Sequence, residues 1–277
     1  MKKIGEELKK GLSKKETYVL AKLSSSGKRF ITIEDIENTV DCSHDNAKRI
    51  ASDLSKKKWL ERIERGKYLI VPLVAGEKGI YTEHEFLIAS QLIDPYYVGY
   101  WSALNFHDFT EQVPYTVFVA TTNRKRDLEL HGVDYKFVTL TENKFFGFEE
   151  YFFAGGKVKI SSPDKTLVDS LDHLEYSGGL EEVSKALASA DGEISREKLV
   201  EYAVKLDNGA VLKRLSYLID LLEIELPKKL RINIKDNFTT GFALLDPTKK
   251  DEGTLRRKWR VKVNVPEEKI IKWSQES

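Results

Sequence analysis

The first 72 residues contain three short amphipathic segments followed by two β-prone runs, and this order constrains the fold more than any other feature of the chain. Ser13 begins the first helical pattern, and Glu16 completes the spacing of a capping box. A second short helix is expected at 34–38. A third, at 43–57, has the i, i+3, i+4 and i+7 pattern of a helix buried on one face, formed by Ala47, Ile50, Ala51 and Leu54.

The β-prone runs at 59–63 and 67–71 flank a turn at 64–66, which predicts a hairpin. Three helices followed by a basic hairpin is the element order of a winged helix-turn-helix. We therefore expect an α+β fold. A winged helix-turn-helix DNA-binding domain would occupy residues 1–74, and a larger mixed α/β C-terminal domain would follow a short linker and occupy residues 80–277.

The third predicted helix carries a row of polar side chains opposite its apolar face. Such a row can hydrogen-bond base edges near the helix N-terminus and phosphates further along. The hairpin turn adds basic residues beside a flexible glycine, which suits phosphates or a minor groove. The predicted DNA-binding residues are Ser43, His44, Asp45, Lys48, Arg49, Ser52 and Lys56 on the helix, and Arg65, Gly66 and Lys67 on the turn.

The charge distribution is uneven along the chain. Residues 1–72 hold 17 Lys/Arg against 11 Asp/Glu, a net charge of +6; residues 73–225 hold 15 against 26, which is −11; residues 226–277 hold 13 against 7, which is +6. A basic N-terminal segment is what contact with phosphates requires. Surface lysines are also common in proteins without nucleic-acid partners, and a winged helix can bind protein instead. A basic cluster at 123–126 is a second candidate for phosphate contact.

In the C-terminal domain we expect mixed strands within 113–161, helices within 163–222 and a basic, β-like tail at 226–277. The tail prediction depends on the runs at 231–234 and 259–263.

A helix start is predicted where Ser162, Pro163 and Asp164 provide an N-cap, a first-turn proline and a first-turn acid. We interpret Asp164 as part of this capping pattern and Asp169 as a residue of an exposed helix face. The aromatic run at 96–107 is expected to lie in the core rather than to stack on bases.

The sequence shows little that indicates catalysis. Phosphate-binding glycine loops, nucleophile elbows and zinc-protease motifs do not occur. The single cysteine, Cys42, excludes an intrachain disulfide and a four-cysteine zinc site. His107 is interpreted as a packed or hydrogen-bonded residue, and His173, although near two aspartates, as part of an exposed helix surface. We predict no catalytic residue, no metal and no cofactor, so the chain is not expected to be an enzyme.

The longest apolar runs fall short of the ~18–20 residues that span a bilayer. The N-terminus lacks the apolar stretch of a signal peptide. We therefore expect a cytoplasmic protein without a membrane partner.

Five segments, taken in order, resemble the AbiEi-type antitoxins of type IV toxin–antitoxin (abortive infection) systems, which are also described as transcriptional regulators of viral defence. The segments are RGKYLIVP at 65–72, YVGYWSALNFH at 97–107, TEQVP at 110–114, VFVAT at 117–121 and ISSPDKTLVD at 160–169. The resemblance covers most of the chain up to about residue 225. One departure is Asp108, which stands where the family pattern has glycine.

The resemblance implies a repressor that binds inverted repeats in its own promoter through the N-terminal domain. It also implies an antitoxin activity of the C-terminal domain, which would oppose a nucleotidyltransferase-like toxin without forming a stable complex. The protein would be a monomer or weak dimer in solution and would bind double-stranded DNA cooperatively.

Two alternatives remain from the residues themselves. Asp134, Tyr135 and Lys136 loosely fit the carboxylate-plus-lysine pattern of a metal-dependent nuclease. The acidic middle segment could instead make the chain an interaction scaffold that docks a basic partner.

Overall fold

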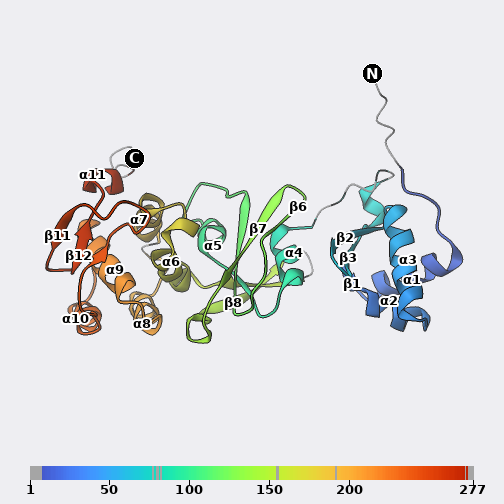
Figure 1. The fold of residues 1–277 in the computed structure, drawn as a ribbon, viewed down its shortest axis with the longest axis horizontal. Coiled ribbons are helices and arrows are strands. Elements are labelled where there is room, and N and C mark those ends of the chain that lie inside the picture. Colours follow the sequence, from blue (N-terminus) through green and yellow to red (C-terminus); the bar gives the residue numbers. More distant parts are fainter. Residues whose placement is uncertain are drawn as a thin grey trace, which may run out of the picture. The chain divides into compact units, whose positions relative to one another are not determined.

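The computed structural model describes residues 8–76, 78, 81, 83–153, 156–190, 192–271 and 273 (Figure 1). The chain divides into two compact units, Met1–Leu92 and Ile93–Ser277, which we call unit 1 and unit 2. Both contain helices and β-sheet, so the protein is of the mixed α+β class. Within the described ranges no helix combines the length and the apolar character that crossing a membrane requires.

Unit 1 begins with three helices, and a short strand lies between the first helix and the second. Its elements are α1 (Lys14–Ser25), β1 (Phe30–Thr32), α2 (Ile33–Val40), α3 (His44–Lys56), β2 (Leu60–Glu64), β3 (Lys67–Ile70), the single turn η1 (Leu73–Ala75) and α4 (Glu85–Leu92). The predicted capping box of α1 is confirmed, because the Ser13 hydroxyl accepts from the Glu16 N–H at 3.3 Å and the Glu16 carboxylate accepts from the Ser13 N–H at 2.6 Å. Thr32 and Asp35 form a second capping box on α2.

The core of unit 1 lies between its helices and an antiparallel sheet with the strand order β1-β3-β2. Ala47 and Ala51 have no exposed surface, so α3 packs closely on its neighbours at these positions. Ile50 and Leu54 complete the buried side of α3, as the sequence pattern predicted.

The division between the units falls later than the sequence suggested. Residue 80, the predicted start of the second domain, lies outside the described residues, and α4 belongs to unit 1. Two contacts connect the segment 83–92 to the rest of unit 1. The Lys67 ammonium donates to the Gln91 carbonyl at 2.6 Å, and Arg29 donates to both carboxylate oxygens of Glu83 at 2.9 and 3.0 Å. Such contacts between distant positions leave no signal in the spacing of residues.

Unit 2 is built around a six-stranded mixed sheet with the order β6-β7-β5-β4-β9-β8. The pairs β5·β7 and β4·β9 are parallel, and the other neighbours are antiparallel. The strands are β4 (Tyr97–Val98), β5 (Thr116–Thr121), β6 (Leu128–Leu130), β7 (Val133–Thr139), β8 (Phe148–Phe153) and β9 (Gly156–Ser161). Tyr97 and Tyr100 have no exposed surface, which confirms that the aromatic run contributes to the core.

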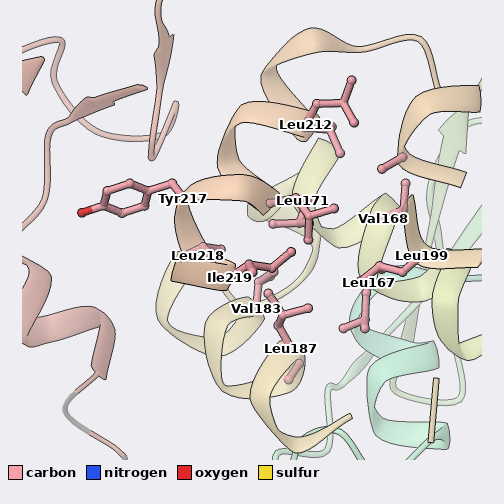
Figure 2. Close-up of a cluster of buried hydrophobic side chains, with 14 of the residues drawn as sticks. Leu167, Val168, Leu171, Val183, Leu187, Leu199, Leu212, Tyr217, Leu218 and Ile219 are labelled. Carbon is pink, nitrogen blue, oxygen red and sulfur yellow. The ribbon is translucent and has the colours of Figure 1, made fainter. Parts of the chain in front are cut away.

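Helices form the rest of the unit 2 core. They are α5 (Tyr100–Phe106), α6 (Pro163–Asp172), α7 (Leu180–Ser189), α8 (Arg196–Lys205), α9 (Gly209–Leu221) and α10 (Lys228–Asp236), with the single turns η2 (Glu142–Lys144) and η3 (Leu174–Tyr176). Figure 2 shows leucine and valine side chains of α6 gathered with those of α7 and α9. The predicted N-cap of α6 is confirmed, with the Ser162 hydroxyl accepting from the Lys165 N–H at 3.3 Å.

The prediction of a β-like tail at 226–277 is wrong for its first part. Residues 231–234 lie in α10, where the buried Ile234 and the partly buried Leu230 are four positions apart on one helix face. The β-branched isoleucines suggested a strand because a run of four residues cannot separate the two periodicities. A small sheet follows, with the order β10-β12-β11, formed by β10 (Ala243–Leu244), β11 (Thr254–Arg256) and β12 (Val261–Val263), and then α11 (Glu267–Ile271).

The exposed face predicted for Asp169 is also wrong. Asp169 is 2% exposed and Asp164 is 5% exposed, because α6 packs against α5, α7, α8 and α9 and is buried almost all round. Asp164 does accept a backbone hydrogen bond, but from the Ser195 N–H at 2.9 Å, which ties the start of α8 to α6.

Candidate nucleic-acid interface

The polar row of α3 faces solvent along the whole helix. All seven of its predicted DNA-binding residues are exposed, whereas the apolar residues between them are buried. Because 13 residues of helix extend about 20 Å at 1.5 Å per residue, this row is long enough to follow a DNA major groove. The exposed side of α3 is therefore a continuous polar surface, and the opposite side of the helix is packed in the core of unit 1.

The N-terminal end of α3 carries hydrogen-bonding groups with mixed charge. The Ser43 hydroxyl occupies the N-cap position without accepting a capping hydrogen bond. His44 is held through Nδ1 by the carboxylate of Glu37, which belongs to α2. One turn further, the Lys48 ammonium lies 3.8 Å from Asp45. These carboxylates reduce the positive charge at this end of the helix.

The cations of α3 and of the hairpin differ in whether they form salt bridges within the protein. Arg49 and Lys56 are exposed, and none of the salt bridges in the described part of the chain involves either. Arg65 is exposed at the hairpin turn, and Gly66 has φ = +80°, which a side chain would strain. The turn is thus a two-residue connection with one cation at its tip.

Lys67 is placed differently from the prediction. Its ammonium donates to the Gln91 carbonyl at 2.6 Å and lies 3.8 Å from Glu64, so it contacts α4 rather than standing free on the turn. The sequence around a turn cannot reveal a carbonyl partner 24 residues away.

Two exposed residues near this surface were missed by the sequence prediction. Asn46 lies in the first turn of α3 and Arg62 lies on β2, where its Nε donates to the Glu64 carbonyl at 3.3 Å. The helical spacing already contained the signal for Asn46, because residues 45, 46, 48 and 49 together form the outward side of one turn. For Arg62 the strand alternation gave no signal, because it places Arg62 on the face of the buried Leu60, and the pairing of β2 with β3 is irregular between Arg62 and Glu64.

In unit 2 the charged residues of α6 form a closed cluster. The Lys165 ammonium contacts the Asp169 carboxylate, lies 3.3 Å from the Tyr97 hydroxyl and stands 4.6 Å from the centre of the Phe146 ring. The Tyr97 hydroxyl donates to Asp169 at 2.9 Å. Burial raises the pKa of Asp169 despite the opposing effect of Lys165. Lys165 has no exposed surface, so this cluster acts as a structural contact.

The other sequence candidates are placed as follows. His107 is hydrogen-bonded as predicted, through Nε2 to the Ser161 carbonyl at 2.8 Å. His173 stacks on Tyr176 with 5.3 Å between ring centres and contacts Glu175 at 3.0 Å. Asp134 is exposed and lines a shallow 380 Å³ pocket with Asp127 and Glu129. Among the residues that the structure describes, no group of three or more His, Cys, Asp and Glu side chains is arranged to hold a metal.

The basic loop at 123–126 follows β5. Arg124 and Arg126 are exposed, the Asn123 amide donates to the Asp94 carbonyl at 2.8 Å, and the Lys125 ammonium stands 5.5 Å from the centre of the Phe137 ring. The loop is thus a second, smaller cationic surface.

Comparison with known proteins identifies the fold only. No protein-family model matches the chain, and no curated protein matches it in sequence. The chain is similar in structure to the RV2827C protein from Mycobacterium tuberculosis, with a TM-score of 0.69 over 97% of this chain and 98% of that chain, at 12% sequence identity. The two proteins therefore share a fold along nearly their whole lengths.

Proposed function

We propose that this protein is a DNA-binding transcriptional autorepressor and antitoxin, and that unit 1 is a winged helix-turn-helix that carries the DNA contact. The observation that supports this best is the exposed polar row of α3, which lies opposite a fully buried apolar side. A helix held in this way can enter a major groove without disturbing the core.

Each part of unit 1 has a distinct role in the proposal. Lys48, Arg49 and Lys56 contact phosphates or guanine edges, and Ser43 and Asn46 hydrogen-bond near the helix N-terminus. Arg65 at the hairpin tip contacts a phosphate or the adjacent minor groove. The net charge of +6 over residues 1–72 favours approach to DNA at low salt.

The promoter fragment of the protein's own operon tests this role. We expect Lys48→Gln/Arg49→Gln to weaken binding in a gel-shift series by roughly a hundredfold and to lower its salt dependence. Lys14→Gln/Lys22→Gln removes the same charge from exposed positions of α1 and serves as the matched control. Equal binding by the two double variants would refute the assignment of α3 as the recognition helix.

The antitoxin part of the proposal is motivated by the family resemblance of residues 65–169. The toxin would be a nucleotidyltransferase-like protein encoded beside this gene, opposed by unit 2 without a stable complex. Co-expression should restore growth of cells that make the toxin, and Lys48→Gln/Arg49→Gln should keep this rescue while losing promoter repression. Absence of rescue by the unaltered protein would contradict the antitoxin role and leave the DNA-binding role standing.

A further inference from the structure

A pocket of unit 2 lies directly beside the basic turn that joins β11 to β12. Its volume is 290 Å³, and its lining residues are Tyr217, Asp220, Leu221, Arg256, Trp259 and Glu267. The turn itself, residues 257–260, contributes Arg257, Lys258 and Arg260, all of them exposed. The smallest pockets that bind small molecules have volumes of about 300 Å³. This pocket is therefore large enough for one heterocyclic base but not for a drug-sized ligand.

Aromatic rings form one wall of the pocket. Trp259 and Tyr217 meet edge to face with 5.3 Å between their centres. The Trp259 indole N–H donates to Asp220 at 2.8 Å, and the Tyr217 hydroxyl donates to Glu267 Oε1 at 2.7 Å. These hydrogen bonds fix both rings, so a planar ligand would meet a preformed aromatic surface.

The polar groups at the pocket retain hydrogen-bonding capacity. Arg256 donates from one terminal nitrogen to Glu267 Oε1 at 3.0 Å, which leaves its other N–H groups as donors. The hydrogen bond from Tyr217 lowers the pKa of Glu267, so the carboxylate is ionised near neutral pH. An ionised carboxylate accepts at both oxygens, and the hydrogen bonds described here use Oε1.

Cationic groups border the pocket. The Lys258 ammonium lies 2.7 Å from Asp220 and 4.5 Å from the centre of the Trp259 ring, and its side chain is 57% exposed. Arg257 is exposed in the turn next to it, and none of the ion pairs in the described ranges uses it. A phosphate at this rim would therefore meet an arginine and an ammonium.

We propose that this pocket and the basic turn form a nucleotide-binding site, with an amino-bearing base against the aromatic wall and its phosphate at Lys258 and Arg257. Glu267 accepts from the exocyclic amino group, and Arg256 donates to an adjacent ring nitrogen or carbonyl. The nucleotide is either free or part of a single strand. The site lies in unit 2 and does not depend on duplex binding by α3.

Calorimetric titration of the full-length protein tests the site with cytidine and uridine monophosphates, which differ in the group that would face Glu267. We expect CMP to bind roughly tenfold more tightly than UMP and than inorganic phosphate. Glu267→Gln should erase the CMP preference, because an amide both donates and accepts while still accepting from Tyr217. Arg256→Gln should weaken CMP roughly tenfold.

Lys198→Gln, which also removes one positive charge, at an exposed position of α8, is the matched control and should leave CMP binding unchanged. Should Arg256→Gln fail to fold, Lys258→Gln at the exposed rim serves in its place, with circular dichroism as the check. A single-stranded hexamer of cytidine that binds more than tenfold tighter than CMP would identify the strand as the source, and equal affinity would identify the free nucleotide. CMP affinity no greater than that of phosphate, or an equal loss in the Lys198 variant, would overturn the proposal.

Discussion

Helices α3 and α6 both mix charged with apolar residues, yet they are used in opposite ways. In α3 the charged side chains stand on the exposed side, and its buried side is entirely apolar. In α6 the charged residues Asp164, Lys165 and Asp169 are 5% exposed or less, and each has a fixed partner inside unit 2.

This difference in exposure decides whether a charged residue is available for binding or contributes to the stability of the fold. An exposed charge keeps its hydration and remains available to a ligand, so its removal costs the fold little. A buried charge has lost its hydration and depends on its partner, so removal of that partner leaves a large penalty. The same residue types therefore form a structural contact in unit 2, whereas in unit 1 they are exposed and we propose that they form an interaction surface.

The largest effect is expected from Asp169→Ala in α6. The substitution leaves the Lys165 ammonium without its counter-ion and the Tyr97 hydroxyl without its acceptor. We expect the free energy of unfolding to fall by about 3–5 kcal/mol, measured by urea denaturation. Lys165→Met/Asp169→Leu, which removes both charges and keeps the volume, should recover most of this loss. A loss below about 1 kcal/mol in the single variant would show that α6 resembles α3 after all.

A smaller effect concerns the pH dependence of unit 2. Burial lowers the pKa of His107, partly offset by its hydrogen bond to the Ser161 carbonyl and by Glu149. A histidine whose folded pKa lies below the unfolded value near 6.5 stabilises the fold above that pH and loses the contribution as pH falls through the folded pKa. Thermal unfolding at pH 7 and pH 5 should therefore show a steeper loss for the unaltered protein than for His107→Gln. Parallel losses would rule out this histidine as the cause.

Local sequence signals predicted α3 well, because its structure depends on its own spacing. The buried alanines, the outward polar row and the caps of α1 and α6 all follow from patterns within a few residues. The same reasoning failed for Asp169, whose burial depends on helices that arrive from four different parts of the chain. It also failed for Lys67, whose carbonyl partner lies on α4.

Asp108 stands where glycine was expected, yet the backbone there keeps the conformation that glycine favours. The residue follows the end of α5 with φ = +58°, the left-handed region that favours glycine. Its N–H donates to the Asn105 carbonyl at 3.1 Å, and the Phe109 N–H donates to the Leu104 carbonyl at 2.9 Å, which is the Schellman arrangement. Aspartate tolerates this conformation better than most residues, so the turn expected for glycine is retained.

The N-cap serines of α3 and α6 give a third test of the comparison. Ser162 is buried and accepts a capping hydrogen bond, whereas Ser43 is exposed and accepts none. We expect Ser162→Ala to lower the free energy of unfolding by about 1 kcal/mol and Ser43→Ala to change it by a few tenths at most. Urea denaturation of both variants measures the difference. Equal losses would mean that Ser43 caps α3 in solution, and its hydroxyl would then not be available to DNA.

The smallest effect on stability is expected where the effect on DNA binding is largest. Lys48 and Arg49 are exposed, and the 3.8 Å contact of Lys48 with Asp45 is too long and too hydrated to stabilise the helix much. Lys48→Gln/Arg49→Gln should therefore change the free energy of unfolding by no more than about 0.5 kcal/mol, because glutamine is as good a helix former as either residue. Thermal denaturation measures this on the same preparation used for the gel shift. A destabilised variant would mean that lost DNA binding reports unfolding of unit 1, and the exposed side of α3 would then have to be tested with Ser52→Ala and Lys56→Gln instead.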